Sequence, residues 1–482
     1  MIKPIHTLIS LLSLGALCAL LMWIFPKDGI SLTSDIQLKF ESFDEFLTVD
    51  TLYDKPIANI EEFLNVYEAE IDSTAILDSL RNEEIRVRKE LMRLQFPDTE
   101  RSDLNAFFQQ LYALEKDKSR SLRILHYGDS QIEGDRISGY VRNEMQKRFG
   151  GSGPGLVHIT EVVPTLAIDQ SASDNWFRYT INGKKDTTVQ HNRYGMLAHF
   201  NRAAPYLAEW PHDTVIHSWL EFQPGRMTYS RSKKWNRMKL YSGYCEHPYL
   251  LKVIAGDSVV FADSVRSNQS YDYREFKFVS TPEKVRLEFT GNPGPELYGV
   301  SFDSPSGIHL DNIPLRGSSG TLFKKISKAQ LQQQYNTMDV GLVILQFGGN
   351  VLPYIENVEE AERYGGWFKA QILYLQSLLP DASFLIIGPS DMAIKDKDHF
   401  ITRPYLEDVR NALRATAMET GCAFWDIYEV MGGRNSMQSW VEADPPLAGS
   451  DYTHFTPAGA KRIAELLYKA ISQDYEAWKA AQ

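Results

Sequence analysis

The spacing of apolar residues changes twice along the chain, and each stretch predicts a different kind of structure. Between residues 60 and 94, apolar side chains recur every three or four positions, which is typical of amphipathic helices. From about residue 173 to residue 304, apolar and polar positions alternate in short runs, as in half-buried antiparallel strands. After residue 320, apolar runs of strand length alternate with stretches of helical spacing, which predicts an α/β domain with a parallel sheet.

The α/β pattern also occurs before the strand-rich stretch. Residues 122–127 form an apolar run of strand length, and residues 137–149 follow with helical spacing. Further strands are expected at 307–310, 340–347, 383–387 and 423–425, and helices at 104–114, 327–335, 358–379, 405–420 and 457–472. The strand-rich stretch therefore interrupts one α/β domain whose first strand precedes it.

These patterns divide the 482 residues into segments. The predicted segments are a signal anchor at 1–26, a helical stalk or packed extension at 27–104, an α/β domain at 105–165 and 306–482, and an inserted β-sandwich at 166–305. The sandwich is expected because short strands are broken by Gly, Asn, Asp and Pro at close intervals. A hydrophobic content of 43% is enough for large cores in a chain of two or three domains.

The N-terminal segment is a candidate membrane anchor. Residues 5–25 are almost all apolar and long enough to cross a bilayer of roughly 30 Å. Lys3 precedes this run, and no small-x-small cleavage site follows it, so an uncleaved anchor is favoured over a cleaved signal peptide. In both cases the remaining chain is expected to be exported, facing the periplasm or the cell exterior.

The net charge and the spacing of the cysteines limit the kinds of partner and cofactor that the chain is expected to bind. The net charge of −11 argues against nucleic acid as a partner. The three cysteines lack metal-ligand spacing, and Cys245 and Cys422 lie in different predicted domains, so free thiols and no metal or other cofactor are expected. The glycine-rich run at 150–155 follows a helix instead of opening one, which indicates a helix end, not a phosphate-binding loop.

Three short blocks contain the residue types of an acyl-transfer site. Ser130 follows the strand at 122–127, Asn350 follows the strand at 340–347, and Asp451 and His454 precede the C-terminal helix. A serine hydroxyl needs a base and donors for the oxyanion. We therefore predict Ser130 as nucleophile, His454 as base and Asp451 as the acid that orients it, with the Ser130 N–H and the Asn350 amide as oxyanion donors.

Further residues complete this prediction. A third oxyanion donor is expected from the backbone of a glycine between the blocks, where Gly317 is preferred and Gly195 is the alternative. Asp444 is the alternative to Asp451. Asp129 is expected to brace the turn at Ser130. Gln131 and Gly348 are the other supporting residues of the candidate site.

The blocks, in this order, resemble those of the SGNH (GDSL-type) hydrolases. They are Gly-Asp-Ser at 128–130, a central glycine with Asn312 and the turn 316–318, Gly-x-Asn at 348–350 and Asp-x-x-His at 451–454. The resemblance implies a flavodoxin-like α/β/α domain and a Ser/His/Asp ester hydrolase. It assigns Gly317 and Asn350 to the oxyanion hole. The sequence departs from the family at Gln131, where leucine is usual, and in the long insertion after the first block.

The insertion is similar to that of the peptidoglycan O-acetylesterase and O-acetyltransferase group, in which the sandwich looks like a carbohydrate-binding module. This resemblance implies an acylated polysaccharide or peptidoglycan as substrate. The expected function is a serine esterase that removes O-acetyl or a similar small acyl group. Two alternatives stay open: an O-acyltransferase with a membrane acyltransferase partner, and a catalytically inactive glycan-binding protein. The aromatic rings considered for sugar stacking are Trp219, Tyr229, Trp235, Tyr241 and Tyr244.

Overall fold

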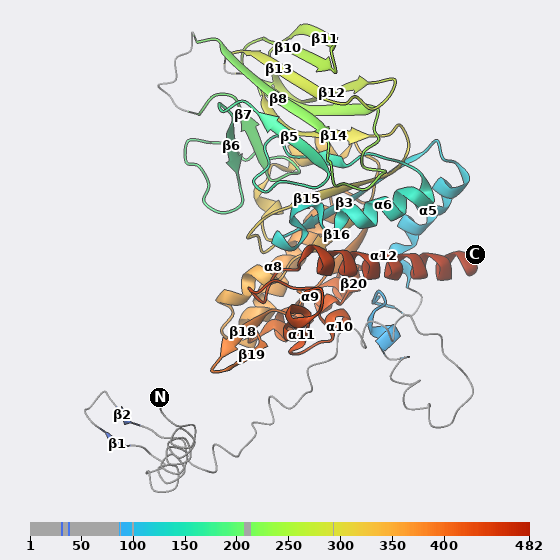
Figure 1. Ribbon diagram of the computed structural model, residues 1–482, viewed down its shortest axis with the longest axis vertical. Helices are drawn as coiled ribbons and strands as arrows, with labels where there is room; N and C mark the ends of the chain where they lie inside the picture. The colour runs from blue at the N-terminus through green and yellow to red at the C-terminus, as the bar shows by residue number, and fades with distance from the viewer. Residues whose placement is uncertain are drawn as a thin grey trace, which may run out of the picture. The chain divides into compact units, whose positions relative to one another are not determined.

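The computed structural model describes residues 30–31, 37–38, 86, 88–98, 101–206, 214–292 and 294–482 (Figure 1). The predicted membrane segment at 5–25 and most of the predicted extension at 27–104 lie outside these residues. Among the described residues, no helix combines the length and the apolar character needed to cross a membrane. Close to the N-terminus, β1 (Ile30–Ser31) pairs in antiparallel fashion with β2 (Gln37–Leu38).

A five-stranded parallel sheet forms the centre of the α/β domain. In spatial order its strands are β15 (Gly307–Pro314), β3 (Ser121–Gly128), β16 (Val340–Gln346), β17 (Ser383–Ile387) and β20 (Ala423–Trp425). Counted along the chain this order is 2-1-3-4-5, which is the flavodoxin-like order. The order reverses between β3 and β16, so their carboxyl ends form the crevice where such sheets bind ligands.

Helices cover both faces of the sheet. One face packs on α7 (Lys328–Tyr335), α8 (Val358–Gln376) and α9 (Leu406–Glu419), and the other on α5 (Asn105–Lys116), α6 (Ser138–Phe149), α10 (Ile427–Met431), α11 (Ser436–Glu442) and α12 (Pro457–Ala480). Successive side chains of β3 point to opposite faces of the sheet, so the strand contributes to both helical layers. Leu125 and Tyr127 belong to one apolar cluster, and Leu122 and Ile124 belong to the other.

The C-terminal helix is longer than the predicted range 457–472. It begins after Thr456, whose hydroxyl accepts a hydrogen bond from the N–H of Gly459, and it continues to Ala480. The apolar spacing persists through Tyr475 and Trp478, whose rings pack against Phe108. This aromatic contact on α5 stabilises the two extra turns. A hairpin of β18 (Ala393–Asp396) and β19 (His399–Thr402) precedes α9, and short 3-10 turns are η2 (Ser102–Leu104) and η4 (Phe323–Lys325).

The insertion consists of two antiparallel sheets that enclose one apolar core (Figure 1). The five-stranded sheet contains β11 (Ser258–Val265), β10 (Tyr249–Ala255), β13 (Val285–Gly291), β8 (Ile216–Pro224) and β5 (Ile168–Ala172). The six-stranded sheet contains β12 (Asn268–Lys277), β9 (Arg237–Cys245), β14 (Glu296–Asp303), β7 (His199–Arg202), β6 (Phe177–Thr180) and β4 (Gly155–Val157). Because β4 pairs with β14, the insert's sheet begins before the predicted boundary at residue 166.

Two segments join the parts of the molecule. Gln95 pairs through its backbone with Phe424, so residues 88–98 of the predicted extension cover the edge strand β20. The glycine-rich run at 150–155 begins with Gly150, which caps α6, and leads directly into β4. A Cβ atom on Gly153, at φ 97°, would stand 2.2 Å from the carbonyl oxygen of Phe302, so only glycine permits this close approach.

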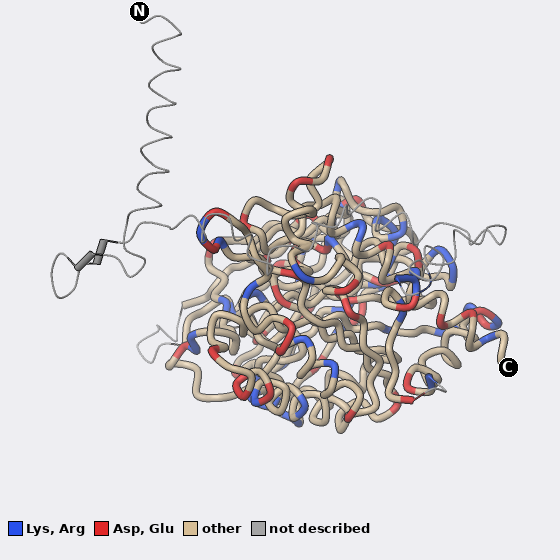
Figure 2. Tube along the Cα trace, turned by 90° about the horizontal axis from the view of Figure 1, so that it is seen from below, with Lys and Arg blue, Asp and Glu red and all other residues tan. Residues whose placement is uncertain are grey.

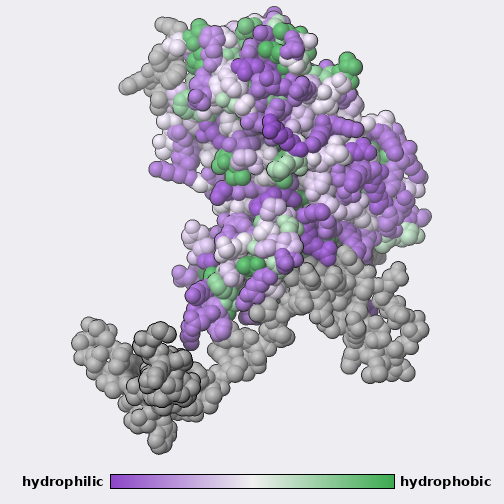
Figure 3. All heavy atoms as spheres, viewed as in Figure 1, coloured by the Kyte–Doolittle hydropathy of each residue, from purple (hydrophilic) through white to green (hydrophobic). Residues whose placement is uncertain are grey.

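The surface of the described part is mixed in character. Lysine and arginine positions are interspersed with aspartate and glutamate positions along the described chain (Figure 2). The face shown in Figure 3 is mainly hydrophilic, with apolar residues in small groups.

Candidate active site

The turn that carries Ser130 lies at the carboxyl end of β3. Ser130 opens the 3-10 segment η3 (Ser130–Asp135), and Asp129 caps it by accepting a hydrogen bond from the N–H of Gln131 at 2.9 Å. The other carboxylate oxygen of Asp129 accepts from the Asn350 amide at 3.1 Å. Burial raises the pKa of Asp129 to about 6, although the Gln131 N–H favours the ionised form. Asp129 therefore links the turn after β3 to the turn after β16.

Ser130, His454 and Asp451 form one chain of hydrogen bonds. The Ser130 hydroxyl lies 2.9 Å from Nε2 of His454, and Nδ1 of His454 lies 2.7 Å from Oδ2 of Asp451. Burial acts to raise the pKa of Asp451, but hydrogen bonds from the His454 ring and from the backbone N–H groups of His454 and Thr453 hold it below its ordinary value. An ionised Asp451 keeps the proton on Nδ1, which leaves Nε2 free to accept the serine proton.

The three oxyanion donors predicted from the sequence lie in three different turns. Asn350 lies in η5 (Gly349–Tyr354), which follows β16, and its Nδ2 atom donates to Asp129 and, at 3.3 Å, to the carbonyl of Ser318. That second contact brings the turn 316–318 against Asn350. Gly317 in this turn is exposed, with φ 72°, and its N–H and that of Ser130 have no hydrogen-bond partner among the described residues. Both backbone donors are thus available to a ligand.

The alternative residues lie elsewhere. The N–H of Gly195 donates to the Gln330 side chain at 3.0 Å, in the buried contact between the insert and α7. The acid that contacts His454 is Asp451, and Asp444 makes no contact with His454. Gly348 adopts φ 124° at the start of η5, where a Cβ atom would meet the side chains of Leu413 and Pro389. Gly348 therefore shapes the backbone that presents Asn350.

A cavity of about 90 Å³ lies beside Ser130 and His454. Its wall opposite the nucleophile includes Ser390 and Met392, which follow β17. The sequence prediction missed these two residues. The signal that could have found them is the end of the strand at 383–387, because the carboxyl ends of parallel strands meet at one edge of the sheet. Their residue types carry no catalytic signature of their own.

Comparison with known proteins shows which molecules the chain resembles. It is similar to a solved peptidoglycan O-acetylesterase at a TM-score of 0.62 and 19% identity, over 80% of this chain and 99% of that one. The chain shares the fold of this esterase. The predicted resemblance to the SGNH hydrolases is thereby confirmed at the level of the fold.

Other similarities are weaker. The chain resembles an acetyl xylan esterase at a TM-score of 0.27 and 16% identity, over 34% of this chain and 81% of that one. It resembles a family two carbohydrate esterase from Clostridium thermocellum at a TM-score of 0.23 and 11% identity, over 54% of this chain and 92% of that one. These scores are too low to carry an argument. No family model matches the sequence, and no curated protein matches it.

Gln131 has contacts that a leucine at this position could not make. Its amide nitrogen donates to the carbonyl of Thr453 at 2.6 Å and to the Ser390 hydroxyl at 3.2 Å, and its amide oxygen accepts from the N–H of Phe455 at 3.4 Å. Arg136 makes a second bridge, since it donates to the carbonyls of Ser130 and Phe455. Two side chains thus tie the nucleophile turn to the loop that carries His454.

Possible metal-ligating side chains and the cysteines are the other candidates for a chemical role. Among the described residues, no group of three or more His, Cys, Asp or Glu side chains has a geometry that could hold a metal ion. Cys245 and Cys422 are free and buried, and burial raises the pKa of the two thiols to about 11 and about 12. Protonated thiols of this kind are poor nucleophiles.

Proposed function

We propose that the protein is a serine esterase that removes O-acetyl or a similar small acyl group from an envelope or extracellular glycan. The observation that carries this proposal is the continuous hydrogen-bond chain from Asp451 through His454 to the Ser130 hydroxyl. A serine with this arrangement is an activated nucleophile. We assign the oxyanion to the N–H groups of Ser130 and Gly317, which have no hydrogen-bond partner among the described residues.

The proposed reaction has two halves. Ser130 attacks the ester carbonyl while His454 takes its proton, and the oxyanion accepts hydrogen bonds from the backbone of Ser130 and Gly317 and from the Asn350 amide. Collapse expels the sugar hydroxyl, which receives its proton from His454. A water molecule, deprotonated by His454, then attacks the acyl-enzyme and releases the acid. Asp451 stabilises the imidazolium in both halves.

The dimensions of the site favour a small acyl group. The cavity beside Ser130 measures about 90 Å³. This is a small space, which suits an acetyl group bound at Ser130. The size of the cavity therefore supports a small acyl group in the proposed substrate.

The exposure of the triad favours hydrolysis over transfer to a sugar. The side chains of His454 and Asp451 are 39% and 53% exposed. A transferase must keep water from its acyl-enzyme, and an open histidine offers water a direct approach. The O-acyltransferase, supplied by a membrane acyltransferase partner, is the alternative that we regard as second. The third alternative, an inactive glycan-binding protein, is disfavoured by the complete hydrogen-bond chain.

The proposed setting follows from the N-terminal segment. The apolar run at 5–25 supports export and anchoring in a membrane, with the catalytic domain facing the periplasm or the cell exterior. The solved peptidoglycan O-acetylesterase that shares the fold supports an acetylated envelope glycan as substrate. We propose peptidoglycan or another acetylated polysaccharide as the polymer.

The test measures acetate release by the full chain from p-nitrophenyl acetate and from an acetylated oligosaccharide, with and without a sugar acceptor. Ser130→Ala and His454→Ala should each reduce turnover at least 1,000-fold, in keeping with the loss of a nucleophile or base. The exposed residues Ser264 and His217 provide matched controls, and Ser264→Ala and His217→Ala should retain full activity. Acetylated acceptor as the main product would indicate a transferase, and undiminished turnover in Ser130→Ala would refute the triad.

A further inference from the structure

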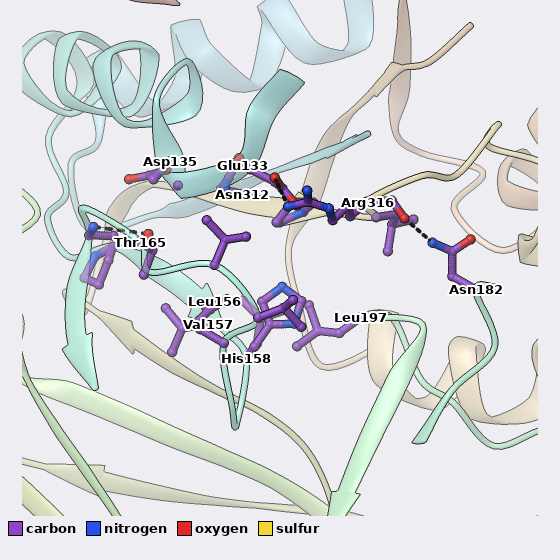
Figure 4. A pocket seen from close by; sticks show the side chains of 18 of the residues that line it. Glu133, Asp135, Leu156, Val157, His158, Thr165, Asn182, Leu197, Asn312 and Arg316 are labelled. Carbon is purple, nitrogen blue, oxygen red and sulfur yellow. Dashed lines mark hydrogen bonds and ion pairs between the residues drawn. The ribbon is translucent and has the colours of Figure 1, made fainter. Parts of the chain in front are cut away.

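A larger cavity of about 210 Å³ lies where the insert meets the α/β domain. We call it the insert cleft. Figure 4 shows Glu133, Asn312 and Arg316 of the α/β domain on one side, and Leu156, His158 and Leu197 of the insert on the other. Arg178 and Glu161 of the insert also line it. Clefts between domains are preferred sites for small polar ligands.

The insert cleft and the cavity beside Ser130 lie along the same turn of the chain. Glu133 lies in η3, the same turn that begins with Ser130. Arg316 directly precedes Gly317 in the chain and forms an ion pair with Glu133 at 3.1 Å. Arg136 donates to the carbonyls of both Glu133 and Ser130. A ligand in the insert cleft therefore lies next to the residues that hold the reacting ester.

The charges of the insert cleft balance, but one opposite pair is held apart. Arg142 and Asp135 form a buried two-bond ion pair at 2.6 and 2.8 Å, and Arg316 is paired with Glu133. Arg178 and Glu161 remain, and neither has an ion-pair partner within 4.0 Å among the described residues. Burial raises the pKa of Glu161 to about 7 although Arg178 favours the ionised form, so this carboxyl can accept or donate near neutral pH. The gap between the two side chains leaves room for a group that both can bind.

Two stacked histidines add a buried nitrogen that lacks a partner. Nδ1 of His199 lies 2.9 Å from the carbonyl of Leu197 and 3.3 Å from Nη2 of Arg178, and its Nε2 lies 3.3 Å from Nδ1 of His158. Nε2 of His158 is buried without a hydrogen-bond partner among the described residues, and so is Nε of Arg178. Burial lowers the pKa of His158 to about 3, so its ring is neutral at pH 7.

We propose that the insert cleft binds one neutral sugar residue of the glycan, next to the residue whose ester Ser130 attacks. A sugar hydroxyl or acetamido group is both donor and acceptor, so it can accept from Arg178, donate to Glu161 and pair with Nε2 of His158 in either tautomer. The cavity of about 210 Å³ is more than twice the size of the one beside Ser130 and has room for one sugar ring. This inference deepens the proposed function and depends on it for the identity of the neighbouring ester.

The composition of the wall excludes the stacking mode considered from the sequence. Among the described residues, no Trp, Tyr or Phe lines the insert cleft, and its apolar lining includes Leu156, Val157 and Leu197. Of the rings considered for stacking, Trp235 and Tyr241 are buried in the core, and Trp219 lies under the guanidinium of Arg286. Recognition here rests on hydrogen bonds from charged groups and on aliphatic contacts.

The first arm of the test measures binding by titration calorimetry on the full chain, with chitotriose and cellotriose as neutral probes. The variants are Arg178→Met, which keeps the aliphatic stem, and Glu161→Ala. Each should raise the Kd for the better probe at least 10-fold, which is the usual effect of losing a hydrogen bond to a charged group. Arg286→Met is the matched control, because Arg286 lies on the outer strand surface, pairs with Glu221 and Glu288, and should bind normally.

The second arm compares the kcat/KM for an acetylated oligosaccharide with that for p-nitrophenyl acetate, which has no second sugar. The ratio of the two should fall at least 10-fold in both cleft variants and stay unchanged in Arg286→Met. Equal midpoints of thermal unfolding in the wild type and the three variants would show that folding is intact. If Arg178→Met misfolds, Glu161→Ala still tests the proposal, because Glu161 lies at a partly exposed position.

The two proposals can fail separately. If the wild type binds a probe and the cleft variants lose that binding while no ester is hydrolysed, the sugar site stands and the esterase fails. If esters are hydrolysed but neither probe binds, or binding and the kcat/KM ratio survive both cleft substitutions, the sugar site is refuted and the esterase stands.

Discussion

At the residue scale, Asn350 has two partners that compete with its proposed role. Its amide nitrogen donates to Asp129 at 3.1 Å and to the Ser318 carbonyl at 3.3 Å. The longer bond is the weaker one, and we expect it to be exchanged for the oxyanion during the reaction. Asn350→Ala should then lower kcat about 100- to 1,000-fold with little change in KM.

Steady-state kinetics on p-nitrophenyl acetate checks this expectation. The exposed residue Asn336 provides the control, since Asn336→Ala should keep the wild-type kcat. An unchanged kcat in Asn350→Ala would assign the oxyanion to the backbone donors of Ser130 and Gly317 alone. A large rise in KM at constant kcat would instead indicate that Asn350 binds the ground state.

Gln131 is expected to position His454 without touching the substrate. Because its amide bonds the backbone at Thr453 and Phe455, Gln131→Leu removes two contacts to the loop that carries His454, and a third to the Ser390 hydroxyl. A small displacement of a catalytic group is costly, so kcat should fall about 10- to 100-fold while KM changes less than about 3-fold. Labelling of Ser130 by a fluorophosphonate should slow in parallel.

The control for Gln131 is Gln438→Leu, which removes only an exposed hydrogen bond to Glu442. Wild-type turnover and labelling in Gln131→Leu would mean that Arg136 alone holds the loop.

The sequence could identify Ser130, Asn350, Asp451 and His454 because each block directly follows a strand or precedes a helix. It could not assign a role to Gln131, since that role depends on how closely two loops approach, and no residue pattern encodes that distance.

At the element scale, a buried ion-pair cluster joins the insert to the parallel sheet. Arg123 of β3 donates to Asp303 of β14 and to Asp311 of β15, both at 2.6 Å. Asp311 also accepts from the N–H of Leu156 in β4. Arg123→Met leaves two carboxylates buried without their cation, and should lower the free energy of unfolding by about 3–5 kcal/mol.

Urea unfolding of the full chain measures this loss. Lys147→Met is the control, because Lys147 pairs with Glu144 at the surface and should change stability by less than about 0.5 kcal/mol. A loss below about 1 kcal/mol in Arg123→Met would show that the cluster contributes to orientation and not to stability.

The elements differ in how well their patterns predict them. The parallel strands are recognisable because both faces are buried, which produces unbroken apolar runs such as 340–347. By contrast, β7 is fully buried yet contains His199, Asn201 and Arg202, so its pattern indicates a loop. Hydrophobic periodicity cannot detect a buried strand that carries polar side chains of this kind.

At the scale of the whole molecule, the insert and the α/β domain share one apolar cluster. Leu156, Tyr241 and Tyr298 of the insert belong to the same cluster as Tyr127 and Leu345 of the parallel sheet. The sequence predicts that one domain interrupts the other, because the α/β pattern of apolar spacing gives way to alternating positions and later resumes. It does not predict this shared core or the insert cleft beside it, since both arise from contacts between segments far apart in the chain.

The whole molecule should lose stability in acid because histidines are buried in neutral form in both parts. Burial lowers the pKa of His126 on β3 to about 4, against 6.5 for an ordinary histidine, and the pKa of His158 in the insert to about 3. Between these values and 6.5 the unfolded chain binds more protons than the folded one. Stability from these groups is therefore complete above pH 6.5 and falls as the pH is lowered.

His126→Gln isolates one contribution, because all other titrating groups remain the same in both proteins. Between pH 7 and pH 5 the wild type should lose about 2 kcal/mol more unfolding free energy than the variant does. The exposed His217 serves as the control, and His217→Gln should follow the wild-type curve. Parallel pH curves for His126→Gln and the wild type would show that His126 takes up its proton equally in the folded and unfolded chains, contrary to its burial beside Gln346 and Ser138.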